Sequence, residues 1–175
     1  MKKLFLLPLL FCFSCNCTKL TTSTSSAPVQ SKIETVCPDD GTCTLEFYKN
    51  KEMVIVKDGI GTMSYKLQDN PNTSVVYYQY KRTTDPALQD ASHREEIVFE
   101  IENNASRLDL NNGELQQTKM LFGRHCFCRG QAGYFRVVQG TLHLNNEKGV
   151  LDFALDYKIK EVPQTLTQLK GSFKQ

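Results

Sequence analysis

The stretch Glu96-Ile97-Val98-Phe99-Glu100-Ile101-Glu102 decides the fold class, because apolar side chains recur in it at every second position. Successive side chains of a β-strand point to opposite faces of the sheet, so Ile97, Phe99 and Ile101 share one face. The even positions are mostly acidic. The pattern predicts a half-buried strand with one apolar face and one solvated face.

The same period of two recurs along 151–160, where apolar residues alternate mostly with charged ones. Eight further segments are rich in β-branched and aromatic residues, which favour strands. They are 44–48, 53–57, 63–67, 74–82, 107–110, 119–123, 134–138 and 141–144. Turn-forming pairs separate them: Asp58-Gly59, Asn112-Gly113, Asn145-Asn146 and Lys148-Gly149.

A helix is indicated only at 85–89, where Asp85 suits the N-cap and Pro86 the first helical position. We therefore expect an all-β fold: a single antiparallel β-sandwich or barrel of about eight to ten short strands, with at most one short helix. The spacing of short strands does not by itself separate a sandwich from a barrel.

The beginning of the chain indicates export. Lys2 and Lys3 precede an apolar run over 4–13, as in a signal peptide, and the run is shorter than the ~20 residues that span a bilayer. We expect 1–14 to be a signal peptide. The next segment, 15–34, is rich in serine and threonine and is predicted to be a flexible polar tether, with an ordered strand within 29–36 as the alternative. The rest, 35–175, is expected to form a single β-rich domain.

The signal ends in a small residue directly before a cysteine, Ser14-Cys15, and this resembles the lipobox of bacterial lipoproteins. The resemblance implies that Cys15 is lipidated, that it becomes the first residue of the mature chain, and that the lipid anchors the protein to a membrane of the bacterial cell envelope. Cys12 and Phe13 depart from the usual lipobox, so release as a plain secreted protein is the alternative.

The basic excess of the chain belongs to the signal. The full sequence has 21 basic and 19 acidic residues, and removing 1–14 removes two lysines. A neutral mature chain without a lysine or arginine cluster argues against nucleic-acid binding, whose affinity comes largely from neutralised phosphates.

Four cysteines fall in the expected domain: Cys37, Cys43, Cys126 and Cys128. In an oxidising compartment they predict two structural disulfides. Local pairing suits the turn-rich seven-residue segment 37–43, whereas 126 and 128 in an extended strand have Cα atoms ~6.6 Å apart, near the upper limit for a disulfide. Chain entropy favours bridges between the two pairs, at ~4.6 kcal/mol against ~2.4 kcal/mol for the local seven-residue loop. Cross-bridging is the preferred expectation, and local pairing and free thiols stay open as alternatives.

A functional alternative centres on His125, Cys126 and Cys128, which offer an imidazole and two thiols between Arg124 and Arg129. Such a group could be a weak metal site or a redox-active pair. In a strand, however, His125 points away from both cysteines. We therefore favour structural disulfides and expect no metal site.

No catalytic or cofactor-binding motif is present, and the charged cluster that includes His93, Glu95 and Glu96 is interpreted as a solvated loop. The segment 123–138, with its glycines at 123, 130 and 133, indicates bends or close backbone approach. Together with 37–43 and 161–164 it resembles, in general appearance, small exported lipoproteins of the Bacteroidetes, a group with no assigned activity. We expect a non-enzymatic binding or structural module without a cofactor; the alternative is a thiol-based redox or metal-handling lipoprotein that uses Cys126 and Cys128.

Overall fold

The computed structural model describes residues 29–174 apart from 86 and 89. The described residues form two five-stranded antiparallel sheets and a two-stranded ribbon. Sheet A has the order β1 (Gln30–Ile33), β12 (Gln168–Lys174), β11 (Val150–Tyr157), β10 (Gly140–Glu147), β7 (Arg107–Asn111). Sheet B has the order β2 (Gly41–Tyr48), β5 (Thr73–Arg82), β6 (His93–Glu102), β8 (Leu121–Cys126), β9 (Gly133–Arg136). The ribbon pairs β3 (Lys51–Lys57) with β4 (Met63–Asp69).

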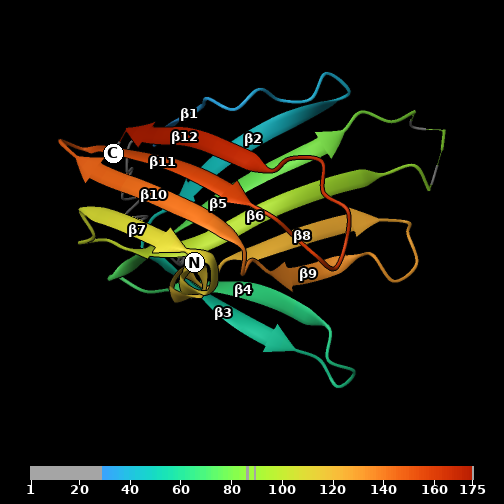
Figure 1. Cartoon of the computed structure of the whole chain (residues 1–175), viewed down its shortest axis with the longest axis horizontal. Coiled ribbons are helices and arrows are strands. Elements are labelled where there is room, and N and C mark those ends of the chain that lie inside the picture. The colour runs from blue at the N-terminus through green and yellow to red at the C-terminus, as the bar shows by residue number, and fades with distance from the viewer. Residues whose placement is uncertain (1–28, 86, 89, 175) are drawn as a thin grey trace, which may run out of the picture.

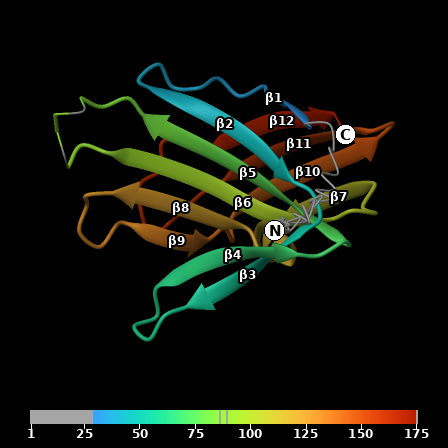
Figure 2. The same cartoon turned by 180° about the vertical axis from the view of Figure 1, so that it is seen from behind.

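The two sheets pack face to face, with sheet A in front in Figure 1 and sheet B in front in Figure 2. Their inner faces enclose one core, in which the rings of Phe99 and Phe153 meet edge to face at 5.7 Å between centroids. Each sheet keeps two edge strands, so the fold is a β-sandwich and not a closed barrel. The all-β prediction is confirmed, and the structure decides between its two versions.

The ribbon forms a third layer on the outer face of sheet B. Met53 of β3 packs there in a cluster with Val75, Val98 and Leu121, all at most 1% exposed. The stretch that decides the fold class is therefore buried on both faces. The expectation of a solvated face for 96–102 is wrong, since the ribbon covers Val98 and leaves Glu96 only 3% exposed.

Sheet A behaves as the alternation predicts. Leu151, Phe153 and Leu155 of β11 are buried, whereas Asp152 and Asp156 between and beyond them are exposed. No further layer of the described residues covers this outer face, so period-two patterning and burial agree.

All ten predicted strands are present, and two more were missed. Strand β12 was not predicted, because Gly171 interrupts the alternation of its apolar residues. A Cβ atom at position 171 would lie 2.6 Å from Leu45 Cδ2, so this position of the inner face has room only for glycine. Strand β1 lies within the stretch predicted to be tether and pairs with β12, as the alternative for 29–36 proposed. The predicted turn at Asn145-Asn146 is wrong, because both belong to β10.

The short helix is elsewhere than expected. The 3₁₀-helix η1 (Asn112–Thr118) begins where a turn was predicted, and Glu114 Oε2 accepts a hydrogen bond from the Asn111 backbone N–H at 2.9 Å. Of the predicted helix at 85–89, Pro86 and Gln89 lie outside the described residues. In the remainder the Leu88 N–H bonds to the Asp85 carbonyl at 3.0 Å, which makes a turn.

Candidate functional site

Both disulfides lie at one end of the sandwich, which we call the disulfide end. It is formed by the connections β1–β2, β5–β6, β8–β9 and β11–β12, at the right of Figure 1. The register of sheet B brings the β5–β6 and β8–β9 connections together, because Arg94 near the start of β6 pairs with both Lys81 and His125. The β11–β12 connection joins them through the hydrogen bond of Thr165 to Glu95. The described chain begins at the opposite end, where Gln30 pairs with Lys174.

The cysteines pair locally, Cys37 with Cys43 and Cys126 with Cys128, with Cα–Cα distances of 5.9 and 5.2 Å. The preference for cross-bridges is wrong for a geometric reason. Strands β2 and β8 are separated by β5 and β6, so their backbones lie ~14 Å apart at the usual strand spacing. A disulfide requires Cα atoms within about 7 Å.

The Cys126–Cys128 bridge is possible because β8 ends at Cys126 and the chain bends at Phe127. The bend is followed by a turn at Gly130, which has a φ of 73°, so the glycine signal in the sequence was informative. Phe127 projects outward and is 80% exposed.

The two bridges differ in what they stabilise. Cys37 and Cys43 pack against the core, and the Tyr78 hydroxyl lies 3.0 Å from Cys43 Sγ. Neither Cys126 nor Cys128 belongs to that core cluster. By chain entropy a three-residue loop contributes only ~1.6 kcal/mol, against ~2.4 kcal/mol for seven residues. The Cys126–Cys128 bridge therefore contributes less to the stability of the fold than the Cys37–Cys43 bridge.

His125 lies on the other side of sheet B from the cysteines, as strand alternation predicts. Its Nε2 is 3.4 Å from Glu96 Oε2, and its ring is 5.3 Å from that of Tyr134. The structure therefore does not assemble His125, Cys126 and Cys128 into one ligand set. Within the described residues no group of three or more histidine, cysteine, aspartate or glutamate side chains is arranged to hold a metal ion.

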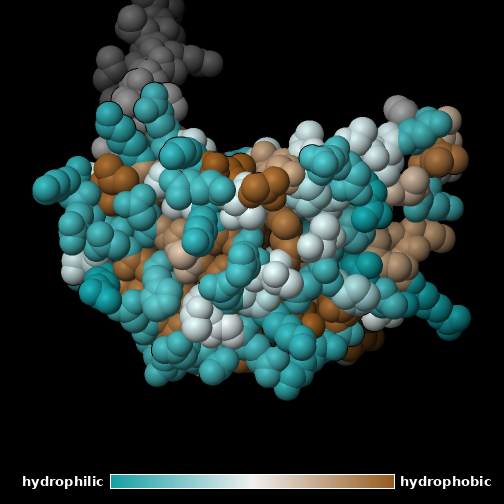
Figure 3. Space-filling view, turned by 45° about the horizontal axis from the view of Figure 1, so that its top comes forward, coloured by the Kyte–Doolittle hydropathy of each residue, from teal (hydrophilic) through white to brown (hydrophobic). Residues whose placement is uncertain are grey.

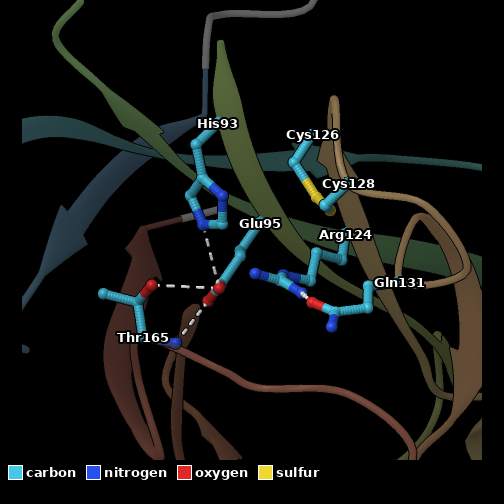
Figure 4. Close-up of a disulfide and its surroundings, with 7 residues drawn as sticks. All are labelled: His93, Glu95, Arg124, Cys126, Cys128, Gln131 and Thr165. Atoms are coloured by element: carbon cyan, nitrogen blue, oxygen red, sulfur yellow. Dashed lines mark hydrogen bonds and ion pairs between the residues drawn. A yellow bond between two sulfur atoms is a disulfide. The ribbon is translucent and has the colours of Figure 1, made fainter. Parts of the chain in front are cut away.

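A different histidine lies beside the bridge. His93 pairs directly across the sheet with Cys126, and its Nε2 is 3.1 Å from Glu95 Oε1. Thr165 of the β11–β12 connection donates two hydrogen bonds to the Glu95 carboxylate, from its backbone N–H at 2.8 Å and from its hydroxyl at 2.9 Å. Figure 4 shows the imidazole to the left of the disulfide, with the Glu95 carboxylate below the imidazole.

The interpretation of the charged cluster as a solvated loop holds for Asp85 and Asp90, which are exposed between β5 and β6, and is wrong for His93 and Glu95, which are 8% and 4% exposed. The sequence did contain the signal that would have found them. Continuing the alternation of Ile97, Phe99 and Ile101 backwards by two and four residues places Glu95 and His93 on the same inner face. Thr165, which approaches from 70 residues away, had no such signal.

Arg124 of β8 completes the inner row, opposite Glu95. Its Nη1 donates to Gln131 Oε1 at 2.6 Å, while its buried Nε has no hydrogen-bond partner. Its guanidinium lies on the same face as His93 and Cys126 (Figure 4), so a fixed positive charge is close to the bridge.

The outer face of sheet B carries a second buried carboxylate, Glu96. Burial raises its pKa, but hydrogen bonding to His125 and Tyr134, with the charges of His125 and Arg94, outweighs burial and lowers the pKa overall. The Arg94 Nε–Glu96 Oε1 distance is 2.8 Å and the Tyr134 hydroxyl donates at 2.7 Å. Burial raises the pKa of nearby Tyr77 to about 12. These groups belong to sheet B, and the ribbon joins them where the ring of Tyr65 meets that of Tyr134 edge to face at 5.3 Å between centroids.

The outer face of sheet A has an open hollow of about 790 Å³. Asp109 lies in it between Arg107 and His143, with 2.7 Å from Asp109 Oδ1 to His143 Nδ1. Hydrogen bonds from Arg107 and then His143 lower the Asp109 pKa. All three side chains are well exposed, which distinguishes this pair from the buried His93–Glu95 pair.

Comparison of the chain with protein-family models, with curated proteins and with solved structures finds no match. In the part of the chain that the structure describes, no helix has the length and apolarity needed to cross a membrane. The predicted signal peptide, Cys15 and Cys17 lie outside the described residues.

Proposed function

We propose that the protein is a membrane-anchored lipoprotein of the bacterial cell envelope, and that its sandwich is a binding module which contacts a protein partner through the disulfide end. The observation that carries the proposal is the position of the exposed apolar side chains. Apart from Val138, which is 43% exposed in the β9–β10 connection, the exposed large apolar side chains of the described residues are Ile60, Val36, Phe127 and Leu88, at 91%, 85%, 80% and 60%. They occupy the turn of the ribbon and three of the connections at the disulfide end, which lie on the same side in Figures 1 and 2.

Exposed apolar tips on one side of the molecule favour a protein partner over a small ligand. On the face drawn in Figure 3 most of the surface is hydrophilic. Hydrophobic residues are exposed there in small separate areas, one of them at the tip on the right. Aromatic side chains on rigid supports make efficient interface anchors, because little conformational freedom is lost on binding. Phe127, held between two bridged cysteines, suits that role.

The anchor rests on the sequence and is consistent with this orientation. A lipidated Cys15 followed by about fifteen polar residues would reach ~20 Å from the headgroups. The described chain begins at the end opposite the disulfides. The apolar tips would then face away from the anchoring membrane, where a partner has access.

Site-specific photo-crosslinking in intact cells tests the binding surface. We expect a photoreactive amino acid at position 127 to give a discrete adduct with a protein. The matched control at position 152, on the exposed outer face of sheet A, should give none. Adducts of equal yield at both positions, or none at 127, would refute the proposed surface.

The anchor needs its own measurement. Metabolic labelling with palmitate should label the wild-type chain and not Cys15→Ser, whereas Cys17→Ser should keep the label. Unchanged labelling of Cys15→Ser would remove the proposed anchor without affecting the crosslinking result.

A further inference from the structure

We infer that Cys126 and Cys128 form a thiol–disulfide exchange site, in which His93 is the acid–base group and Glu95 is a positioning residue. The substrate class is a protein dithiol or disulfide exposed in the envelope. This activity goes beyond the proposed binding function and does not depend on it.

The first support is the alignment of His93 with Cys126. The two residues are direct cross-strand partners in the antiparallel pair β6–β8. Such partners share a face, with Cβ atoms ~4.5–5.5 Å apart. The imidazole therefore shares a face with the sulfur that becomes a thiol when the bridge opens. No hydrogen bond joins His93 to the intact bridge; Nε2 is turned to Glu95, and the other ring nitrogen is on the cysteine side (Figure 4).

The second support is the fixed orientation of that imidazole. Glu95 contacts His93 Nε2 and is itself held by the two hydrogen bonds from Thr165. A reactive group, a base within reach and a third group that orients the base are the arrangement that activates cysteine nucleophiles in general. Here the thiol, the imidazole and the carboxylate come from two neighbouring strands of a rigid sheet.

The third support is charge and access around the bridge. Arg124 shares the inner face and Arg129 is exposed just after Cys128; positive neighbours favour the thiolate form of a cysteine. Both cysteines are half-buried rather than enclosed. A pocket of about 180 Å³ beside the bridge is lined by His93 and by basic side chains, although neither cysteine lines it.

The groups that face His93 come from every strand packed against it and from the segment before β2. They are Glu95 on β6, Tyr80 and Arg82 on β5, Arg124 on β8, and Asp40, which accepts a hydrogen bond from Tyr80.

The fourth support is the contrast with the other bridge. Cys37–Cys43 closes the longer loop and packs against the core, which explains it as a staple. Cys126–Cys128 closes only three residues and lies outside the core cluster. Stabilisation of the fold therefore explains the Cys37–Cys43 bridge and leaves the Cys126–Cys128 bridge largely unexplained.

The exchange proceeds in two displacements. A thiolate of the substrate attacks Cys128 Sγ, a substrate–Cys128 disulfide forms, and the Cys126–Cys128 bond breaks with its electron pair on Cys126 Sγ, which takes a proton from His93. The second thiol of the substrate returns a proton to His93 and attacks the substrate sulfur of the mixed disulfide, so that Cys128 leaves as thiolate. The substrate loses two electrons and becomes a disulfide, and Cys126 and Cys128 gain them.

The wild-type protein provides the first test. The full chain, purified in detergent, is incubated with reduced glutathione, quenched with acid, alkylated and analysed by mass spectrometry. We expect Cys126–Cys128 to open at least about tenfold faster than Cys37–Cys43. Equal rates, or faster opening of Cys37–Cys43, would overturn the inference without any substitution.

Two variants test the acid–base group. His93→Gln and Glu95→Gln should slow opening of Cys126–Cys128 by about tenfold or more, as expected for lost proton transfer. After correction for the thiolate fraction of glutathione, the rate should vary with pH in the wild type and be flat in His93→Gln. The matched control is His143→Gln, which breaks the exposed pair with Asp109 and should leave rate and profile unchanged.

A folding defect is separated from a chemical one by a third variant. Thr165→Val removes the 2.9 Å hydroxyl bond to Glu95 and keeps the backbone bond; it should slow exchange severalfold while circular dichroism stays native. A folded His93→Gln or Thr165→Val that exchanges at the wild-type rate and pH profile would refute the role of the histidine.

Discussion

At the scale of single residues, Glu96 shows how a charge becomes a structural part of this sandwich. Its carboxylate is 3% exposed and contacts Arg94, His125 and Tyr134. Because the folded protein lowers the pKa of Glu96, the unfolded chain binds the proton more tightly. The stabilisation is present above the ordinary pKa of a glutamate and is lost as the pH falls through the lowered value.

We therefore predict that Glu96→Gln lowers the free energy of unfolding by about 2 kcal/mol at pH 7, the usual worth of hydrogen bonds to a buried charge. The loss should shrink as the pH falls below about 4, where the wild type protonates as well. Urea denaturation at several pH values measures this. Glu102→Gln, at the exposed end of the same strand, is the control and should cost little. A deficit that stays constant from pH 7 to pH 3 would contradict the assignment.

At the scale of elements, the ribbon β3–β4 covers a face of sheet B that the alternation of residues in β6 predicts to be solvated. Alternation predicted two of the ten strands together with their inner faces, because hydrophobic burial acts on every second side chain, and composition and turn signals predicted the other eight. Alternation could not predict that a ribbon covers the outer face of β6, since a face with Glu96, Val98 and Glu100 reads as solvated. Covering it depends on partners distant in sequence: Glu100 accepts from the Met53 N–H at 2.6 Å and from Lys119 Nζ at 2.8 Å.

The ribbon should carry a measurable share of the stability. We predict that Met53→Ala lowers the free energy of unfolding by about 3 kcal/mol, because it leaves a cavity over Val75, Val98 and Leu121. Val54→Ala is the matched control on the opposite face of the same strand, where the side chain is half-buried, and should cost under about 1 kcal/mol. Equilibrium urea denaturation gives both values. Equal losses would mean that the ribbon does not pack as a layer.

The candidate site was foreseen only in part, and the reason lies in the same elements. The cysteines, their local pairing as one of two options, and the outward direction of His125 follow from spacing and strand geometry. The association of His93 and Glu95 with Cys126 depends on the register between β6 and β8, and that of Thr165 on a connection that crosses from the other sheet. Neither is encoded in a short segment.

At the scale of the whole molecule, the first described residues and the disulfide end lie at opposite ends of the sandwich. The pairing of Gln30 with Lys174 joins β1 to β12 and fixes the first described residues at the end remote from the disulfides. A ten-residue strand such as β6 is ~33 Å long, which sets the scale of the separation. A chain anchored through Cys15 would hold both the exposed apolar tips and the Cys126–Cys128 bridge away from its own membrane.

This orientation predicts a graded effect in a paramagnetic bilayer. With the full lipidated chain in nanodiscs that contain nitroxide-headgroup lipid, amide NMR signals of β1 and of Lys148-Gly149 should broaden. Signals of 127–131 should stay sharp, because broadening falls steeply with distance and these residues lie at least a strand length further out. Cys15→Ser, which should remain in solution, is the control and should show no broadening at either end. Strong broadening of 127–131 would mean that the apolar tips bind the membrane itself, and it would replace the protein partner with a lipid surface.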